Sequence, residues 1–122
     1  MDRVAKAAAY LRKVALAYPE AWEDHPWGDD VIKVRTRIFL LLGEGEKLSV
    51  TTKLPVSSGI ALSEPNARPT GYGLGRAGWV SISFEADREA PLDMLELWID
   101  ESYRAVAPKR LVAQLNARNA EG

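Results

Sequence analysis

The sequence predicts an α+β fold in which an N-terminal helix and C-terminal helices pack on one face of an antiparallel sheet. Three observations support this prediction. Apolar residues recur at three- and four-residue spacing near both ends of the chain, whereas alternating and β-branched segments occupy its middle. Glycines and prolines separate these segments. At 122 residues the chain suits one hydrophobic core, so we expect a single domain over residues 1–122.

The first helix is predicted over residues 2–18. Asp2 can cap its start and Pro19 ends it. A surface helix of this kind buries one apolar stripe against the core. The residues of the stripe are Val4, Ala7, Ala8, Leu11, Val14, Ala15 and Tyr18.

Three strands are predicted at residues 31–35, 37–42 and 47–53, and they form an antiparallel meander. The link between the first two lacks the Asn-Gly or Gly-Gly that is typical of a tight hairpin. Residues 54–78 are rich in proline and glycine, which predicts a loop with one helical turn and a short strand near Gly71–Leu74. The segment 79–85 alternates again and predicts a further strand.

Two helices are predicted at the C-terminal end. Pro91 suits the first turn of one helix, and Pro108 separates it from the next. The first helix has the apolar stripe Leu92, Leu95, Ile99, Ser102 and Val106, with Trp98 beside it, and the second has Leu111, Val112 and Leu115.

Alternation along the strands predicts which residues the helices cover. The covered face should hold Ile32, Val34, Leu48, Val50, Thr52, Val80, Ile82 and Phe84. The open face should hold Lys33, Arg35, Ser49, Thr51, Lys53, Trp79, Ser81 and Ser83. Cations, hydroxyls and an indole suit a phosphate-bearing chain, although the same residue types are typical of any face that contacts water.

The charges are segregated along the chain, although the net charge is only −1. Residues 31–84 carry seven basic and three acidic residues, whereas residues 85–101 carry one basic and seven acidic residues. The small net charge argues against a strongly electrostatic nucleic-acid binder. The absence of cysteine excludes disulfides, thiolate metal sites and cysteine nucleophiles. With no apolar run of membrane-spanning length, we expect a cytoplasmic protein.

The stretch WEDHPWGDDVIKVR is the best candidate for an active site, because it holds the single histidine of the chain. His25 has no second histidine as a partner, and Asp29 and Asp30 diverge on an extended chain. We therefore predict no catalytic residues, no metal site and no cofactor. Binding of a hard cation by the acidic residues of this stretch is a third, lower-ranked alternative.

Several segments together resemble the MmcQ/YjbR family of small bacterial proteins over roughly residues 5–112. They are YPEAWEDHPWGDDVIKVRTRIFLLL, KLSVTTKLP, GYGLGRAGWVSISF and LDMLELWIDESYRAVAPKRL. The resemblance implies a CyaY-like (frataxin-like) fold and a label of DNA binding through a double wing of hairpins. The chain departs from the family pattern at Gly75-Arg76-Ala77-Gly78, which retains one basic residue, and at Arg35-Thr36-Arg37, which has no glycine.

The leading hypothesis is a non-enzymatic protein that binds double-stranded DNA. Its expected phosphate contacts are Lys33, Arg35, Arg37, Lys53 and Arg76, with Trp79 as a stacking or packing residue. The alternative is a module that binds a small molecule or a protein partner in a cleft lined by His25, Trp27 and Trp79.

Overall fold

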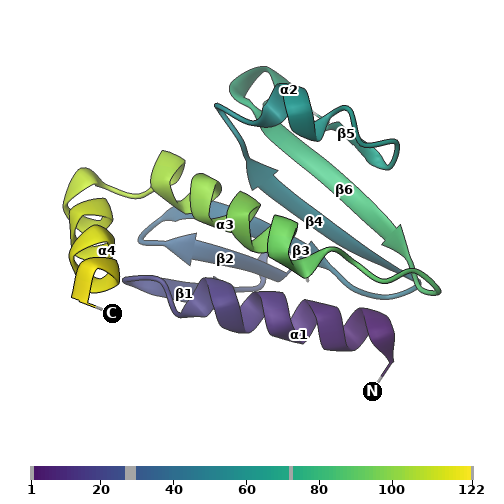
Figure 1. Cartoon of the computed structure of the whole chain (residues 1–122), viewed down its shortest axis with the longest axis horizontal. Helices are drawn as coiled ribbons and strands as arrows, with labels where there is room; N and C mark the ends of the chain where they lie inside the picture. Colours follow the sequence, from purple (N-terminus) through teal and green to yellow (C-terminus); the bar gives the residue numbers. More distant parts are fainter. Residues whose placement is uncertain (1, 27–29, 72, 122) are drawn as a thin grey trace.

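The computed structural model describes residues 2–26, 30–71 and 73–121. Within these residues it confirms the α+β class, with an N-terminal helix, a six-stranded antiparallel sheet and two C-terminal helices (Figure 1). The expected CyaY-like relationship stays a prediction. Trp27 and Asp29, which the sequence analysis singles out, fall outside the described residues.

The first helix, α1, spans Arg3–Leu16. The backbone N–H of Ala5 donates to Oδ1 of Asp2 at 2.7 Å, so Asp2 caps the helix as predicted. Val4, Ala8, Leu11 and Ala15 are buried. These are four residues of the predicted stripe, and they place α1 against the sheet.

The sheet has the strand order β1-β2-β3-β4-β6-β5, and each neighbouring pair is antiparallel. The strands are β1 (Ala21–Asp24), β2 (Asp30–Val34), β3 (Arg37–Gly43), β4 (Lys47–Lys53), β5 (Ala67–Pro69) and β6 (Trp79–Glu85). The predicted meander and the strand at 79–85 are confirmed. The sequence analysis missed β1, a four-residue edge strand without an alternating apolar pattern.

The connector between β4 and β6 corrects one prediction. The short helix α2 (Ser58–Ala61) confirms the expected helical turn. The expected strand near Gly71–Leu74 is wrong: the strand here is β5, and Leu74–Ala77 form the 3-10 helix η2. Pro69 misled the prediction because proline is disfavoured in central strands, but β5 is at the edge of the sheet, where proline is tolerated.

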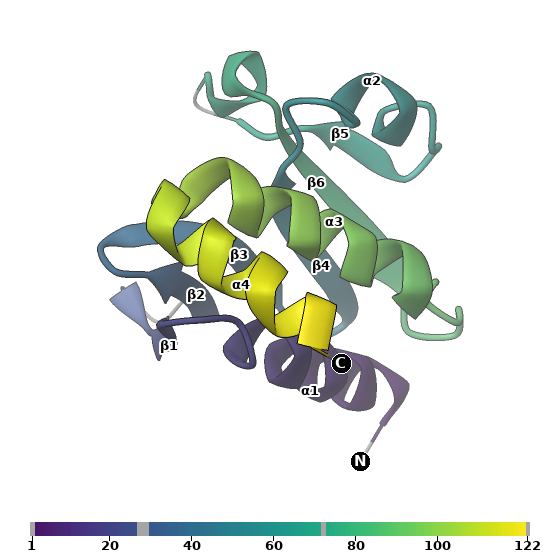
Figure 2. The same cartoon turned by 60° about the vertical axis from the view of Figure 1, so that its left-hand side comes forward.

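The core lies between the sheet and two helices, α1 and α3 (Leu92–Val106) (Figure 1). Seven of the eight residues predicted for the covered face belong to this core or pack against it, and the eighth, Thr52, is fully buried. The last helix, α4 (Lys109–Glu121), buries Leu111 and Leu115. It bridges α1 and α3, because Arg118 donates to Ala17 O and Arg104 to Asn116 Oδ1 (Figure 2).

No helix within the described ranges combines the length and the apolar character that crossing a membrane requires.

Candidate nucleic-acid interface

The antiparallel topology brings most of the predicted phosphate contacts to one end of the sheet. The C-terminal ends of β2 and β4 and the first residues of β3 and β6 lie at this end. It therefore carries Arg35, Arg37, Lys53 and Arg76, and we call it the basic end. The opposite end, formed by the end of β1, the β3–β4 turn and the end of β6, carries Asp24, Asp30, Glu44, Glu46 and Glu85.

The β2–β3 turn explains how a tight hairpin forms without glycine. Val34 pairs with Arg37, so the turn consists of Arg35 and Thr36 alone. Arg35 adopts φ +56°, a left-handed conformation that glycine or asparagine normally provides. The indole Nε1 of Trp22 donates to Arg35 O at 2.7 Å and holds the turn against β1.

Two of the predicted phosphate contacts already have acidic partners. Lys33 Nζ donates to Asp24 Oδ2 at 2.8 Å and lies 5.3 Å from the ring centroid of Trp22. Its side chain is only 19% exposed. Arg35 Nε lies 3.3 Å from Glu20 Oε1. These contacts lower the pKa values of Asp24 and Glu20, through the hydrogen bonds from Lys33 and Arg35 respectively.

The other three predicted contacts lack such partners. Among the described residues, no acidic side chain forms an ion pair with Arg37, Lys53 or Arg76. Arg37 and Arg76 are exposed and Lys53 is half-buried. Their charges are therefore available to an external anion.

Lys53 and Trp79 lie opposite each other on β4 and β6, on the face away from the helices. Leu54 N donates to Gly78 O at 2.8 Å, which holds η2 and Arg76 beside the end of β4. Gly78 has φ +91°, and a Cβ there would lie 3.3 Å from the Leu54 backbone. Only glycine fits this close approach without strain.

One cation of the open face was missed by the sequence analysis. Arg68 on β5 pairs with Ser81 on β6, next to Thr51 on β4. Arg68 is exposed, whereas Thr51 and Ser81 are nearly buried and share a hydrogen bond of 2.9 Å. Arg68 was missed because the sequence analysis predicted it in a loop, where a residue has no assigned face of the sheet.

The ESYRAV segment of α3, which carries part of the family resemblance, positions this end of the sheet. Ser102 Oγ accepts a hydrogen bond from Lys53 N at 2.9 Å and donates to Phe39 O at 2.6 Å. The pairing of β3 with β4 stops at Leu41 and Thr51, two residues before this point. The hydroxyl thus bridges the two strands where they diverge.

The residues on either side of Ser102 anchor other segments. Glu101 accepts hydrogen bonds from the backbone N–H groups of Val56 and Ser57, at 2.9 and 3.0 Å, and from Ser57 Oγ at 2.6 Å. Tyr103 OH donates to Pro19 O at 2.8 Å and its ring packs on Phe39. The segment is therefore explained by its contacts within the fold.

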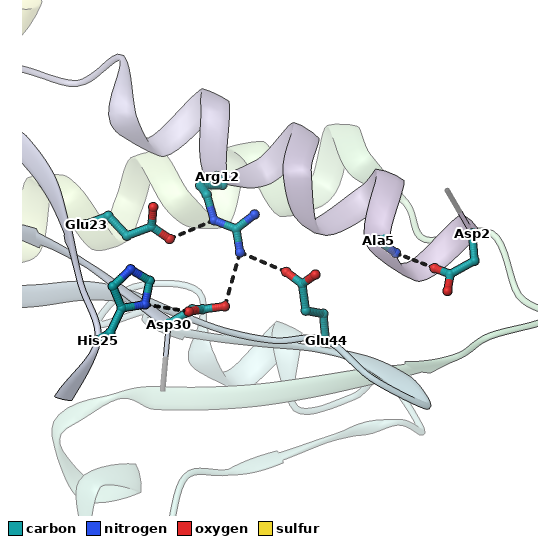
Figure 3. Close-up of polar contacts among 7 residues, drawn as sticks. All are labelled: Asp2, Ala5, Arg12, Glu23, His25, Asp30 and Glu44. Carbon is teal, nitrogen blue, oxygen red and sulfur yellow. Dashed lines mark hydrogen bonds and ion pairs between the residues drawn. The ribbon is translucent and has the colours of Figure 1, made fainter. Parts of the chain in front are cut away.

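The acidic end contains a cluster around Arg12 (Figure 3). The guanidinium contacts Glu23 Oε2 and Glu44 Oε2 at 2.8 Å each, and Asp30 Oδ2 at 3.2 Å. His25 Nδ1 lies 2.8 Å from Asp30 Oδ1. Glu23, His25 and Asp30 are close enough to share a cation, but Arg12 already neutralises part of their charge. Arg12 was not singled out from the sequence, because its partners lie far along the chain.

Two residues of the alternative ligand cleft, His25 and Trp79, lie far apart on the sheet. His25 follows β1, whereas Trp79 begins β6, four strands away in the sheet order. At about 4.8 Å per strand, this separation is about 19 Å. Trp27 lies outside the described residues, so the cleft stays a prediction.

A family model described as YjbR matches residues 16–105. The match covers most of the chain, from the last residue of α1 almost to the end of α3. The chain belongs to the YjbR family. This confirms the family resemblance that the sequence indicated, and it leaves α4 outside the matched region. A search of the curated proteins gives no match.

Proposed function

We propose that this YjbR protein binds the phosphates of double-stranded DNA through the basic end of its sheet. The observation that carries the proposal is the position of Arg37, Lys53 and Arg76, which come from three segments of the chain and lack acidic partners among the described residues. Cations that are not neutralised within the protein can release counterions from DNA, which is the main source of affinity for its backbone.

The remaining predicted contacts have smaller roles in this proposal. Lys33 and Arg35 must share their charge with Asp24 and Glu20, so each contributes less than an unpaired cation. Trp79 lies opposite Lys53 on the open face, and in this proposal it packs against, or stacks on, the bound chain. In this proposal the exposed turn Arg35-Thr36 serves as a wing that contacts the DNA backbone.

A charge-reversal experiment tests the proposal. The variant Lys53→Glu/Arg76→Glu removes two of the three unpaired cations, so we expect its affinity for a fluorescently labelled duplex at low salt to fall more than about tenfold. Fluorescence anisotropy measures this affinity. Thermal melting should show that the variant is folded, because neither side chain is part of the core.

The matched control is Lys6→Glu/Arg88→Glu. Both residues are exposed, neither is part of an ion pair among the described residues, and both lie toward the acidic end. The control changes the net charge equally but should weaken binding much less. Equal losses of duplex affinity in the two double variants would mean that binding depends on net charge alone. Undetectable binding of the unmodified protein at low salt would contradict the proposal.

A further inference from the structure

Two guanidinium groups from separate elements converge on the carboxylate of Glu20. Arg35 Nε, in the β2–β3 turn, lies 3.3 Å from Glu20 Oε1. Arg110 Nη2, in the first turn of α4, lies 3.2 Å from Glu20 Oε2. Each arginine therefore contacts a different oxygen of the same carboxylate. Arg110 lies outside the region matched by the family model.

The backbone is strained at both partners of the Glu20–Arg35 ion pair. Both residues have φ +56°, and they are the non-glycine residues with positive φ among those described. A glycine or asparagine would adopt this conformation at lower cost. Strain of this kind often accompanies a functional site. Here it falls on two charged residues that contact each other, which indicates that their side chains serve a purpose.

This purpose is not the stability of the fold alone. The side chains of Glu20, Arg35 and Arg110 are 46%, 45% and 65% exposed. Ion pairs this exposed to water contribute little to stability. The same exposure makes the carboxylate easy to displace, since both arginines can be reached from solvent.

We propose that Arg35 and Arg110 form a binding site for one phosphate group and that Glu20 occupies this site in the free protein. A phosphate offers more acceptor oxygens than a carboxylate, and arginine pairs well with either group. The carboxylate of Glu20 thus competes with phosphate for the same two guanidinium groups. The site lies at the basic end, because Glu20 immediately precedes β1 at the edge beside the β2–β3 turn.

The assignment of DNA as the source of the phosphate rests on the proposed function. If DNA is the ligand, the site adds a contact from α4 to those of Arg37, Lys53 and Arg76. Free phosphate and phosphomonoesters share the same chemistry and would bind the site without DNA. The two sources are distinguished by measuring duplex and inorganic phosphate separately.

The test compares Glu20→Gln with Glu64→Gln. Both substitutions remove one negative charge from an exposed residue, but Glu64 is part of no ion pair among the described residues. Glu20→Gln releases two guanidinium groups, so we expect its duplex affinity at low salt to exceed that of Glu64→Gln by about fivefold or more. Its plot of log K against log salt should be steeper by about 1 to 2. In Glu20→Gln/Arg110→Gln most of this gain should disappear.

A second measurement does not need DNA. Inorganic phosphate, compared with chloride at equal ionic strength, should raise the melting temperature of Glu20→Gln more than that of the unmodified protein or of Glu64→Gln. If Glu20→Gln matches Glu64→Gln in both measurements, the site is overturned.

The outcomes separate this inference from the proposed function. Loss of duplex binding in Lys53→Glu/Arg76→Glu, together with no gain in Glu20→Gln, supports the DNA proposal and refutes the Arg35–Arg110 site. Stabilisation of Glu20→Gln by phosphate, without duplex binding by any variant, supports the site and refutes the DNA proposal.

Discussion

The polar residues of α3 and the cations of the basic end are neighbours that use their polar groups differently. Glu101, Ser102 and Tyr103 direct theirs into the fold, where each contacts backbone atoms of another segment. Arg37 and Arg76 direct theirs to solvent. The ESYRAV segment, which carries part of the family resemblance, is therefore explained by the contacts that hold the fold together. A function is better sought among residues whose charges have no partner within the fold.

The largest effect on stability is expected for Ser102→Ala. It leaves Phe39 O and Lys53 N without their partner at a buried site, and it should lower the free energy of unfolding by about 2 to 3 kcal/mol. Chemical denaturation measures this change. As a control, Ser63→Ala removes an exposed hydroxyl that donates to Ile60 O, and it should cost less than about 1 kcal/mol. Equal losses in the free energy of unfolding in the two variants would contradict the structural role of the Ser102 hydroxyl.

Tyr103→Phe should have a smaller effect, about 1 kcal/mol, because the ring remains packed against Phe39 and Tyr18 while the hydrogen bond to Pro19 O is lost. Denaturation with urea measures the loss. Affinity for duplex DNA should stay within about twofold, since Tyr103 is fully buried. A large loss of affinity in this variant would mean that α3 does more than support the sheet.

Thr52→Val should have the opposite effect and raise the free energy of unfolding. Thr52 is fully buried on the covered face, and its Oγ1 has no hydrogen-bond partner among the described residues. Valine has a similar shape and no hydroxyl, so this variant should gain up to about 1 kcal/mol in the free energy of unfolding. A loss of similar size would show that Oγ1 has a partner in solution.

The smallest effect is a pH dependence at Glu101. Burial raises the pKa of its carboxyl, but the hydrogen bonds from Ser57 and Val56 outweigh burial and lower the pKa below its ordinary value of 4.5. The stabilisation is therefore complete above pH 4.5 and is lost as the pH falls through the folded-state pKa. Melting temperatures of Glu101→Gln should fall less on acidification than those of the unmodified protein. Parallel curves would contradict this.

Much of the fold could be predicted because it depends on local patterns. Periodicity gave α1, α3 and the strands β2, β3, β4 and β6. Patterns failed at the edges of the sheet: β1 alternates poorly because Trp22 is exposed, and β5 contains Pro69. Edge strands are short and partly exposed, so they require less apolar sequence.

The candidate site could be predicted less well. Charge segregation along the chain corresponds only in part to segregation in space, because antiparallel strands send one segment to both ends of the sheet: Arg37 and Lys53 lie at the basic end, but Glu44 lies at the acidic end. Ion pairing could not be predicted, since Glu20 meets Arg35 and Arg110 only after folding. That pairing decides which charges remain available to a ligand.

The most direct test of the central claim is the salt dependence of duplex binding by the unmodified protein. Three unpaired cations, Arg37, Lys53 and Arg76, predict a slope of about −2.7 in a plot of log K against log salt. This corresponds to a loss in affinity of about 40-fold between about 50 and 200 mM salt. A slope near zero, or no binding at low salt, would contradict the claim that the unpaired charges of the basic end bind phosphate.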